Sequence, residues 1–273
     1  MSHDLTVGDV RQSRQLARQQ AITAAVMAEG AIRIEQLAER FDISIMTVHR
    51  DLDELESRGL LRKNRGVATA TSTSLVESSD VYRSSRQTYE KEELALSALD
   101  LVEPGEAVML DDSTTVLHLA RHLQEKAPLT VITNVLTIIN ELRDLRGINL
   151  VAVGGEYYSW CSAFMGGMTT QTIRNLRADT FIMSTAAIVD DIVLHQKLET
   201  VDVKRAMFES SARRILLADH TKFDKRALHA LAPLTDFDLV IVDQQTPQAH
   251  IERLLQAGVN VKVATHGQRR IAN

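Results

Sequence analysis

The sequence has little cysteine and no long apolar segment. Cys161 is the one cysteine among 273 residues, which excludes an internal disulfide and any metal site built from several thiolates. No run of about 18 apolar residues occurs, and the chain does not open with a basic stretch followed by an apolar one. We therefore expect no membrane span and no secretory signal, and we predict a cytoplasmic protein.

Familiar motifs of nucleotide and metal sites are missing as well. Neither a Gly-x-Gly-x-x-Gly stretch nor a Gly-Lys-Ser/Thr loop is present, which argues against the common nucleotide-binding folds. His195 and His220 are the histidines that most suggest catalysis or metal binding, but neither belongs to a pair spaced i, i+4. We interpret both as hydrogen-bonded loop histidines, and we expect no metal and no cofactor.

The distribution of charge is more informative than its total. The chain has a net charge of −5, with 44% apolar and 25% charged residues, which is typical of a globular protein with a sizeable core. Residues 11–66 contain ten Lys and Arg against eight Asp and Glu, a balance of +2, so the remainder carries −7. A slightly basic N-terminal module on an acidic body is compatible with a DNA-binding function.

Apolar residues recur with helical spacing between residues 16 and 58. This spacing predicts three short helices, with Gly30 ending the first, Ser44 capping the third and Gly59 ending it. The stretch GLLRKNRGVA at 59–68 predicts two short strands joined by a basic turn, so we expect a winged helix-turn-helix. The predicted core residues are Ile22, Ala25 and Val26 in the first helix, Ile34, Leu37, Ala38 and Phe41 in the second, and Ile45, Val48, Leu52 and Leu55 in the third.

The third predicted helix has a polar face suited to a DNA major groove. On a wheel of about 100° per residue, Arg50 points away from the apolar face, with Thr47 and His49 on its flanks. The second half of the helix is acidic and would be repelled by phosphates, so we expect only the first half to enter the groove. We interpret Asp51 as a salt-bridge partner within the protein. The predicted DNA contacts are Ser44, Met46, Thr47, His49 and Arg50 in the helix, and Arg62, Lys63 and Arg65 in the wing.

The pattern changes after the wing. Residues 69–89 are rich in Ser and Thr, have no sustained period and predict a linker. Beyond it, short β-branched runs such as LTVIT (129–133) alternate with helical stretches, which indicates a parallel sheet covered by helices on both faces. We therefore predict an α/β protein with a small winged helix-turn-helix at 1–68, a linker at 69–89, and a Rossmann-like effector and oligomerisation domain at 90–273.

One predicted strand end in the second domain suggests an anion site. The stretch VMLDDSTTV at 108–116 places Asp111 at the end of a strand and the hydroxyls of Ser113, Thr114 and Thr115 at the start of a helix. Backbone N–H groups and hydroxyls at a helix start can hold a phosphate, although Asp and Thr are also ordinary caps there. These residues are therefore candidates for effector binding.

Residues 18–68 resemble a known family of bacterial regulators. The stretch RQQAITAAVMAEGAIRIEQLAERFDISIMTVHRDLDELESRGLLRKNRGVA is similar to the N-terminal domain of the DeoR family of transcription regulators. The matching positions include Phe41, the TVHRDL run at 47–52 and Gly66, while His49 stands where an arginine is usual. The resemblance implies a double-stranded DNA operator as partner.

Most of residues 90–265 resemble the effector domain of the same family, which has a sugar-phosphate isomerase-like fold. The motifs are DDSTT, TVITN, AVGG, VKRAMFESS and LLADHTKFDKRAL. The resemblance implies a phosphorylated sugar or polyol as effector, with Lys204 and Lys222 supplying the positive charge that binds its phosphate. The residues that would line its pocket are Asp111, Thr114, Thr115, Thr133, Asn134, Gly154, Lys204 and Lys222.

These observations favour a ligand-responsive transcription regulator. By resemblance it would repress a sugar or polyol catabolic operon and be released by its ligand. We expect a homodimer or homotetramer, because one such head reads only a few base pairs. One alternative is a sugar-phosphate isomerase with an appended regulatory domain and Asp111 or Asp219 as general base. The other is an interaction module that binds no DNA.

Overall fold

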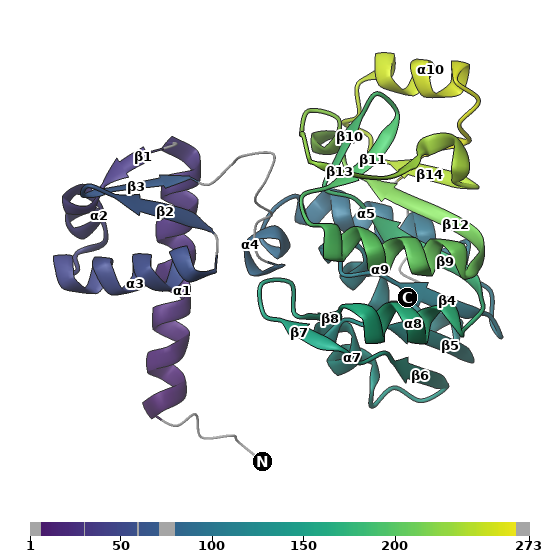
Figure 1. Cartoon of the computed structure of the whole chain (residues 1–273), viewed down its shortest axis with the longest axis horizontal. Coiled ribbons are helices and arrows are strands. Elements are labelled where there is room, and N and C mark those ends of the chain that lie inside the picture. Colours follow the sequence, from purple (N-terminus) through teal and green to yellow (C-terminus); the bar gives the residue numbers. More distant parts are fainter. Residues whose placement is uncertain (1–6, 30, 59, 71–79, 266–273) are drawn as a thin grey trace, which may run out of the picture. The chain divides into compact units, whose positions relative to one another are not determined.

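The structure, a computed structural model, describes the chain except for residues 1–6, 30, 59, 71–79 and 266–273 (Figure 1). The chain separates into two compact units, Met1–Tyr82 and Arg83–Asn273, and each has its own hydrophobic core. No helix within the described ranges is long and apolar enough to cross a membrane.

The N-terminal unit is a winged helix-turn-helix, as predicted. Its helices are α1 (Val7–Glu29), α2 (Ile34–Phe41) and α3 (Ile45–Ser57). Its strands β1 (Ala31–Arg33), β2 (Leu61–Asn64) and β3 (Val67–Ala70) pair antiparallel in the order β1-β3-β2. The turn between β2 and β3 is tight because Arg65 and Gly66 both adopt positive φ, 46° and 78°. The core includes Ile22, Leu37, Val48, Leu52 and Leu55.

Three details of this unit differ from the prediction. The first helix is longer than expected, since α1 has 23 residues. A strand that helical spacing does not reveal, β1, lies between α1 and α2 and pairs with β3. Ile45 was predicted to lie in the core but is 49% exposed, because it is the first residue of α3 and the packed face of that helix begins at Val48. The predicted helix ends Gly30 and Gly59 lie outside the described residues.

The C-terminal unit is built on a seven-stranded parallel sheet. The strand order is β15 (Val261–Val263), β14 (Leu239–Val242), β12 (Ser211–Ala218), β9 (Ala178–Ser184), β4 (Ala107–Leu110), β5 (Leu129–Thr133) and β6 (Ile148–Ala152). Central strands are apolar on both faces, and Phe181, Ile182 and Met183 of β9 are completely buried. Because the strands run in one direction, their carboxyl ends form a single rim, called here the carboxyl edge.

Helices cover this sheet. They are α5 (Thr88–Leu99), α6 (Thr114–Ala120), α7 (Leu136–Leu142), α8 (Gly167–Arg174), α9 (Leu198–Glu209) and α10 (Gln248–Gln256), with short 3-10 turns η1 (Leu123–Lys126), η2 (His220–Lys222) and η3 (Leu234–Asp236). α5 packs on α6, and α8 packs on α9 at the front of Figure 1. Smaller antiparallel sheets are formed by β7 (Glu156–Tyr158) with β8 (Ala163–Met165), and by β10 (Ala187–Val189), β11 (Ile192–His195) and β13 (His229–Pro233). The predicted α/β architecture is confirmed.

The range 69–89, predicted as a linker, contains regular structure at both ends. Its first two residues end β3, and its second half contains α4 (Asp80–Ser84) and the start of α5, while 71–79 lie outside the described residues. The boundary between the two units falls between Tyr82 and Arg83. Residues 83–87 therefore belong to the C-terminal unit, directly after the chain leaves the N-terminal one.

Candidate functional site

The first half of α3 presents exposed polar side chains. Ser44 caps the helix, because its Oγ accepts a hydrogen bond from the Thr47 amide at 3.2 Å and lies 2.8 Å from Thr47 Oγ1. Met46 is 78% exposed, Arg50 is exposed and His49 is half-buried. The structure thus places the five predicted groove residues together at the capped end of the helix.

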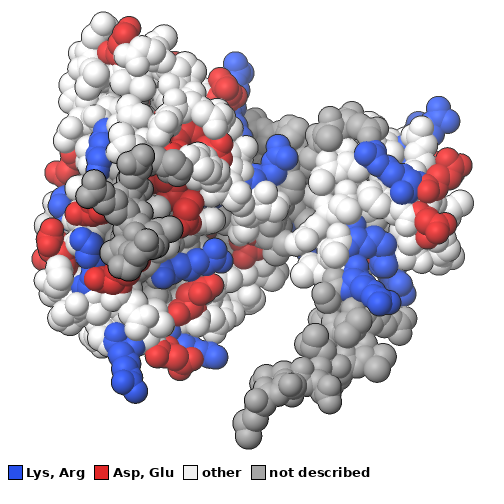
Figure 2. Space-filling model, turned by 180° about the vertical axis from the view of Figure 1, so that it is seen from behind, with Lys and Arg blue, Asp and Glu red and all other residues white. Residues whose placement is uncertain are grey.

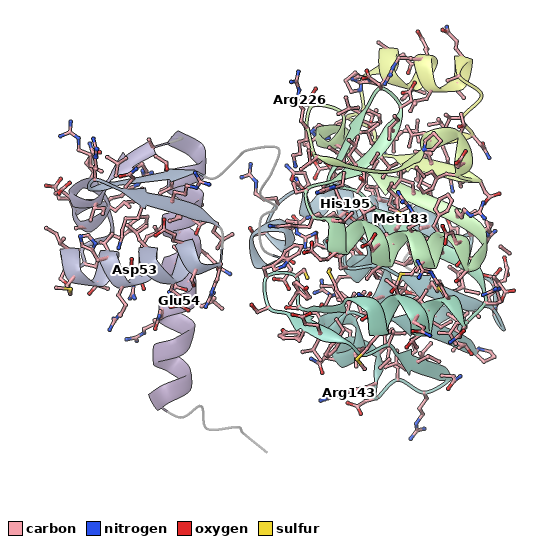
Figure 3. The ribbon with its side chains drawn as sticks, in the orientation of Figure 1. Asp53, Glu54, Arg143, Met183, His195 and Arg226 are labelled. Atoms are coloured by element: carbon pink, nitrogen blue, oxygen red, sulfur yellow. The ribbon has the colours of Figure 1, made fainter. Side chains whose placement is uncertain are left out.

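The acidic half of α3 is bonded inside its own unit. The buried carboxylate of Asp51 accepts hydrogen bonds from Arg18 Nε at 2.6 Å and from Gln19 Nε2 at 3.3 Å. Gln19 also donates to Glu54 at 2.8 Å, and Figure 3 labels Glu54 on this helix. The predicted salt bridge of Asp51 is confirmed, and these two carboxylates serve the fold.

The three cations predicted in the wing have different surroundings. The ammonium of Lys63 pairs with Asp53, and the Lys63 amide donates to Glu56 Oε1 at 2.9 Å. Arg62 and Arg65 are exposed, and Arg65 lies in the turn itself. Figure 2 shows Lys and Arg side chains of this unit, at the right, gathered beside a smaller number of acidic ones. Arg62 and Arg65 are the wing cations best placed to meet a phosphate.

A buried polar cluster lies at the carboxyl edge, directly after β4. Asp111 is 1% exposed, and its Oδ1 accepts hydrogen bonds from the Ser113 amide at 3.0 Å and the Ser113 hydroxyl at 2.6 Å. Its Oδ2 accepts from the Ser184 amide at 3.0 Å and from the ammonium of Lys204. Asp111 therefore ties the ends of β4 and β9 to α9.

Lys204, on α9, lies between two carboxylates with 1% of its surface exposed. Its Nζ pairs with Asp111 and lies 2.9 Å from Asp112 Oδ1. Burial alone would raise the pKa of Asp112, but the charges of Lys204 and Arg83 lower that pKa to about 2. Burial likewise opposes the charge of Lys204, but the two carboxylates raise its pKa. The site therefore keeps Asp112 and Lys204 ionised and away from water.

Several buried polar atoms near the carboxyl edge have no hydrogen-bond partner among the described residues. They are Asp112 Oδ2, Asn134 Oδ1 and both ring nitrogens of His195. Burial and the charge of Lys204 hold the pKa of His195 well below its usual value, so its imidazole is neutral. Buried polar atoms without partners are uncommon in native proteins, and they suggest a ligand or water that bonds to them. This donor and acceptor set fits the hydroxyl groups of a polar ligand.

The interpretation of both histidines as hydrogen-bonded loop residues is wrong for His195 and holds in part for His220, which is hydrogen-bonded but begins the 3-10 turn η2. His195 ends β11 and lacks a ring hydrogen bond within the described part of the chain, whereas His220 Nδ1 lies 2.7 Å from Asp243 Oδ2. His220, Asp243 and Glu90 bring ligand-type atoms within 4.8 Å of one another. Asp243 also accepts bonds from the His220 amide at 3.1 Å and from Thr246 at 2.8 Å, which hold its carboxylate in place.

Other predicted ligand residues also bond locally. Ser113 caps α6, and Thr133 Oγ1 donates to the carbonyl oxygen of Leu110 at 3.0 Å. The carbonyl oxygen of Gly154 accepts from Thr169 Oγ1 at 2.9 Å. Since they follow the neighbouring strands β4, β5 and β6, these residues share the carboxyl edge.

The rest of the predicted set is divided between α6, α9 and η2. Thr114 and Thr115 are buried in the first turn of α6, and Lys222 lies 3.4 Å from Asp219 Oδ2 after β12. The predicted effector contacts did not include Asp112 or His195. Asp112 could have been found from its place in the DDSTT motif, whereas His195 was considered and interpreted as a loop histidine, because its burial depends on how the β11 sheet folds.

Two family descriptions match the chain. Residues 18–74 match the DeoR-like helix-turn-helix domain, and residues 86–244 match the DeoR C terminal sensor domain. The second match alone covers more than half of the chain.

Known regulators are similar to this chain over most of its length. Transcriptional repressor AccR from Agrobacterium fabrum is 34% identical over 231 residues, which cover 84% of this chain and 90% of that protein. The glycerol-3-phosphate regulon repressor of Escherichia coli is 28% identical over 251 residues, 92% and 99% of the two chains. Among solved structures, ribose 5-phosphate isomerase a from Methanocaldococcus jannaschii matches 49% of this chain and 53% of its own, with a TM-score of 0.36 and 13% identity.

Proposed function

Because the chain belongs to the DeoR family of transcription regulators, we propose that it represses a sugar or polyol catabolic operon and leaves the operator when a phosphorylated sugar or polyol binds. The name of one relative, the glycerol-3-phosphate regulon repressor, refers to a phosphorylated polyol and supports this class of effector. The protein is a DNA-binding regulator with a sensor domain. The family descriptions and the relatives named above as repressors favour this function over the isomerase considered from the sequence.

DNA recognition is assigned to the first half of α3 and the wing. The main support is the division of α3, since Asp51 and Glu54 bond inside the unit while Met46 and Arg50 face solvent. A helix of this kind inserts its N-terminal residues into the major groove. Ser44, Thr47, His49 and Arg50 would then bond base edges or phosphates, with Met46 packing on a base, and Arg62, Lys63 and Arg65 would contact the backbone.

Effector binding is assigned to the carboxyl edge. The single observation that supports this most is the set of buried atoms on Asp112, Asn134 and His195 that have no hydrogen-bond partner among the described residues. The ionised Lys204 lies beside Asp112 and acts on His195. Hydroxyls of a sugar or polyol would bond these atoms, and Lys222 would attract the phosphate. The remaining proposed effector contacts are Asp111, Ser113, Thr114, Thr115, Thr133, Gly154 and Lys204.

We place the regulator in the cytoplasm as a homodimer or homotetramer. One head reads only a few base pairs, so useful specificity needs two heads on two half-sites. The sensor unit would supply the contacts between copies.

The DNA assignment is tested with Arg50→Ala. A duplex selected by the protein from a random library serves as operator, and binding is followed by fluorescence anisotropy. The binding free energy should become less favourable by about 1 to 3 kcal/mol, and the variant should discriminate less between bases at the position that Arg50 contacts. Arg143→Ala, which removes an exposed arginine from the sensor unit (Figure 3), should leave affinity unchanged. Equal affinities for Arg50→Ala and the unmodified protein would contradict the assignment.

The effector assignment is tested by thermal shift with a panel of phosphorylated sugars and polyols. A ligand at 100 times its Kd should add about 2.7 kcal/mol to the stability of the sensor unit. The same ligand should weaken operator binding by about 5 to 150-fold. A panel in which unphosphorylated sugars stabilise the protein and their phosphates do not would count against a phosphate site.

A further inference from the structure

A buried lysine holds the main chain that connects the two units. Lys91, in the first turn of α5, is 3% exposed. Its Nζ donates hydrogen bonds to the carbonyl oxygens of Arg83 and Arg86, the second at 2.7 Å. Burying an ammonium costs free energy unless it is hydrogen-bonded, so these two bonds offset the cost of burying Lys91. The segment that it fixes, residues 83–87, is the one that leads to the DNA-binding unit.

Positive charge is concentrated around this lysine. Burial and the charge of Lys222 lower the pKa of Lys91 to about 7, with further contributions from Arg83 and Lys225. Partial burial of its ammonium and the charge of Lys222 lower the pKa of Lys225 to about 8, although the side chain as a whole is exposed. Asp219 is the carboxylate that opposes this effect on both lysines. The five cations, called here the linker cluster, are Arg83, Arg86, Lys91, Lys222 and Lys225.

The linker cluster lies at the carboxyl edge, because Lys222 follows β12 and because Gln245, just after β14, donates a hydrogen bond to the first turn of α5 at 2.6 Å. The charges of Arg83 and Lys222 act on His195, and the charge of Arg83 also acts on Asp112. His195 is 2% exposed, and both of its ring nitrogens lack a hydrogen-bond partner in the described structure. A ligand that bonds His195 and Asp112 therefore has Arg83 and Lys222 within electrostatic reach.

We propose that residues 83–87 form one wall of the effector site, where Arg83, Lys222 and Lys225 receive the anionic group of the ligand and Lys91 holds the segment in place. This inference rests on the proposed effector function. A dianion such as a phosphate monoester relieves the repulsion among the cations and favours the protonated form of Lys91. A charged ammonium bonds two carbonyl oxygens more strongly than a neutral amine. Ligand binding thereby fixes the main chain that leads to the DNA-binding unit.

The first test is hydrogen exchange of the full chain with and without inorganic phosphate, at equal ionic strength in chloride. If opening of residues 83–87 requires phosphate to leave, phosphate at ten times its Kd should slow their amide exchange on the order of tenfold. Phosphate that binds without altering exchange in 83–87 would overturn the proposal, as would a failure of phosphate to bind at all. A sugar phosphate that still stabilises the protein in the thermal-shift panel would in either case leave the proposed function standing.

Variants separate the parts of this wall. Arg83→Gln should weaken phosphate binding by about tenfold or more, since it removes a charged hydrogen-bond donor, whereas Arg143→Gln removes the same charge elsewhere on the unit and should have no effect. Lys91→Met should still bind phosphate but lose the protection of 83–87. Equal phosphate affinity of the two arginine variants would overturn the role of Arg83. If Lys91→Met does not fold, the proposal is still tested by the amide exchange of the unmodified protein and by the phosphate affinities of Arg83→Gln and Arg143→Gln.

Discussion

At the scale of single residues, two buried ionic groups serve different ends. Asp51 is fully buried in the N-terminal unit and is satisfied by Arg18 and Gln19. Asp112 is also buried, but one of its oxygens lacks a partner in the described structure. The first carboxylate stabilises a fold, and the second is available to a ligand.

Asp51→Ala should destabilise the N-terminal unit by about 2 to 3 kcal/mol, because it breaks a buried charged pair and leaves Arg18 partly buried without that carboxylate. Urea denaturation, with amide exchange of α1 and α3 as the probe, measures the change. Asp53→Ala is the matched control. Its carboxylate is 60% exposed and pairs with Lys63, so we expect a loss of about 0 to 1 kcal/mol. Similar losses for both variants would contradict the structural role of Asp51.

The linker cluster predicts a pH dependence of anion binding. Lys91, with a pKa of about 7, and Lys225, with a pKa of about 8, lose their protons as pH rises from 7 to 9 in the free protein. A bound anion favours the protonated lysines and so raises both pKa values, which means that binding takes up protons. Affinity for sulfate, which does not titrate in this range, should therefore fall by up to about tenfold per pH unit for each lysine.

Calorimetric titration with sulfate in buffers from pH 6 to 9 measures this effect. Lys91→Met should flatten the profile without abolishing binding, because Lys222 and Arg83 are still present in the variant. The other charged groups that act on Lys91 are Asp219 and Lys225. A sulfate affinity that is constant over this pH range would show that neither lysine responds to the anion.

At the scale of elements, α3 shows what periodicity predicts and what it cannot. Val48, Leu52 and Leu55 are buried as their spacing requires, and Arg50 faces solvent. Ile45 fits the same spacing but is exposed, because the packed face of the helix begins at Val48. A periodic pattern does not reveal that starting point. The Asp51 salt bridge was foreseeable, since phosphate repulsion excludes this residue from DNA. Its partner lies on α1 and depends on tertiary packing.

The wing predicts a difference between two basic residues. Lys63 is paired with Asp53, whereas Arg65 lies exposed in the turn. Arg65→Ala should lower operator affinity for all sequences and reduce the slope of log affinity against log salt by about 1. Lys63→Ala should change that slope by less, because Asp53 already neutralises much of the charge of Lys63 in the unmodified protein. Fluorescence anisotropy with one duplex over a series of salt concentrations measures both slopes. A larger change of slope for Lys63→Ala than for Arg65→Ala would contradict this prediction.

At the scale of the whole molecule, composition and pattern predicted two units, while the candidate effector site was only partly predictable. Strand ends located Asp111 and Thr133 because parallel strands share one carboxyl edge. His195 was interpreted as a loop histidine, and Lys91 was not considered. One lies on a small antiparallel sheet and the other on α5, and only the fold brings both side chains within reach of the charge of Lys222.

A dimeric or tetrameric regulator predicts a strict spacing of operator half-sites. Two heads fixed by one sensor assembly should prefer half-sites on the same face of the duplex, separated by about 10.5 base pairs or a multiple. Inserting about five base pairs turns one half-site to the opposite face, so affinity should fall towards that of a single half-site. An insertion of a full helical turn is the control. Anisotropy across an insertion series, with analytical ultracentrifugation of the free protein, tests both assembly and spacing.

The carboxyl edge has an evolutionary consequence. Each loop at this rim follows a different strand, and the strands themselves are held by a core that consists mostly of strand and helix residues. An insertion or exchange after β4 or β12 would alter the proposed effector site and leave most of this core unchanged. Gene duplication followed by such local changes would let this scaffold acquire new inducers while retaining its folding stability.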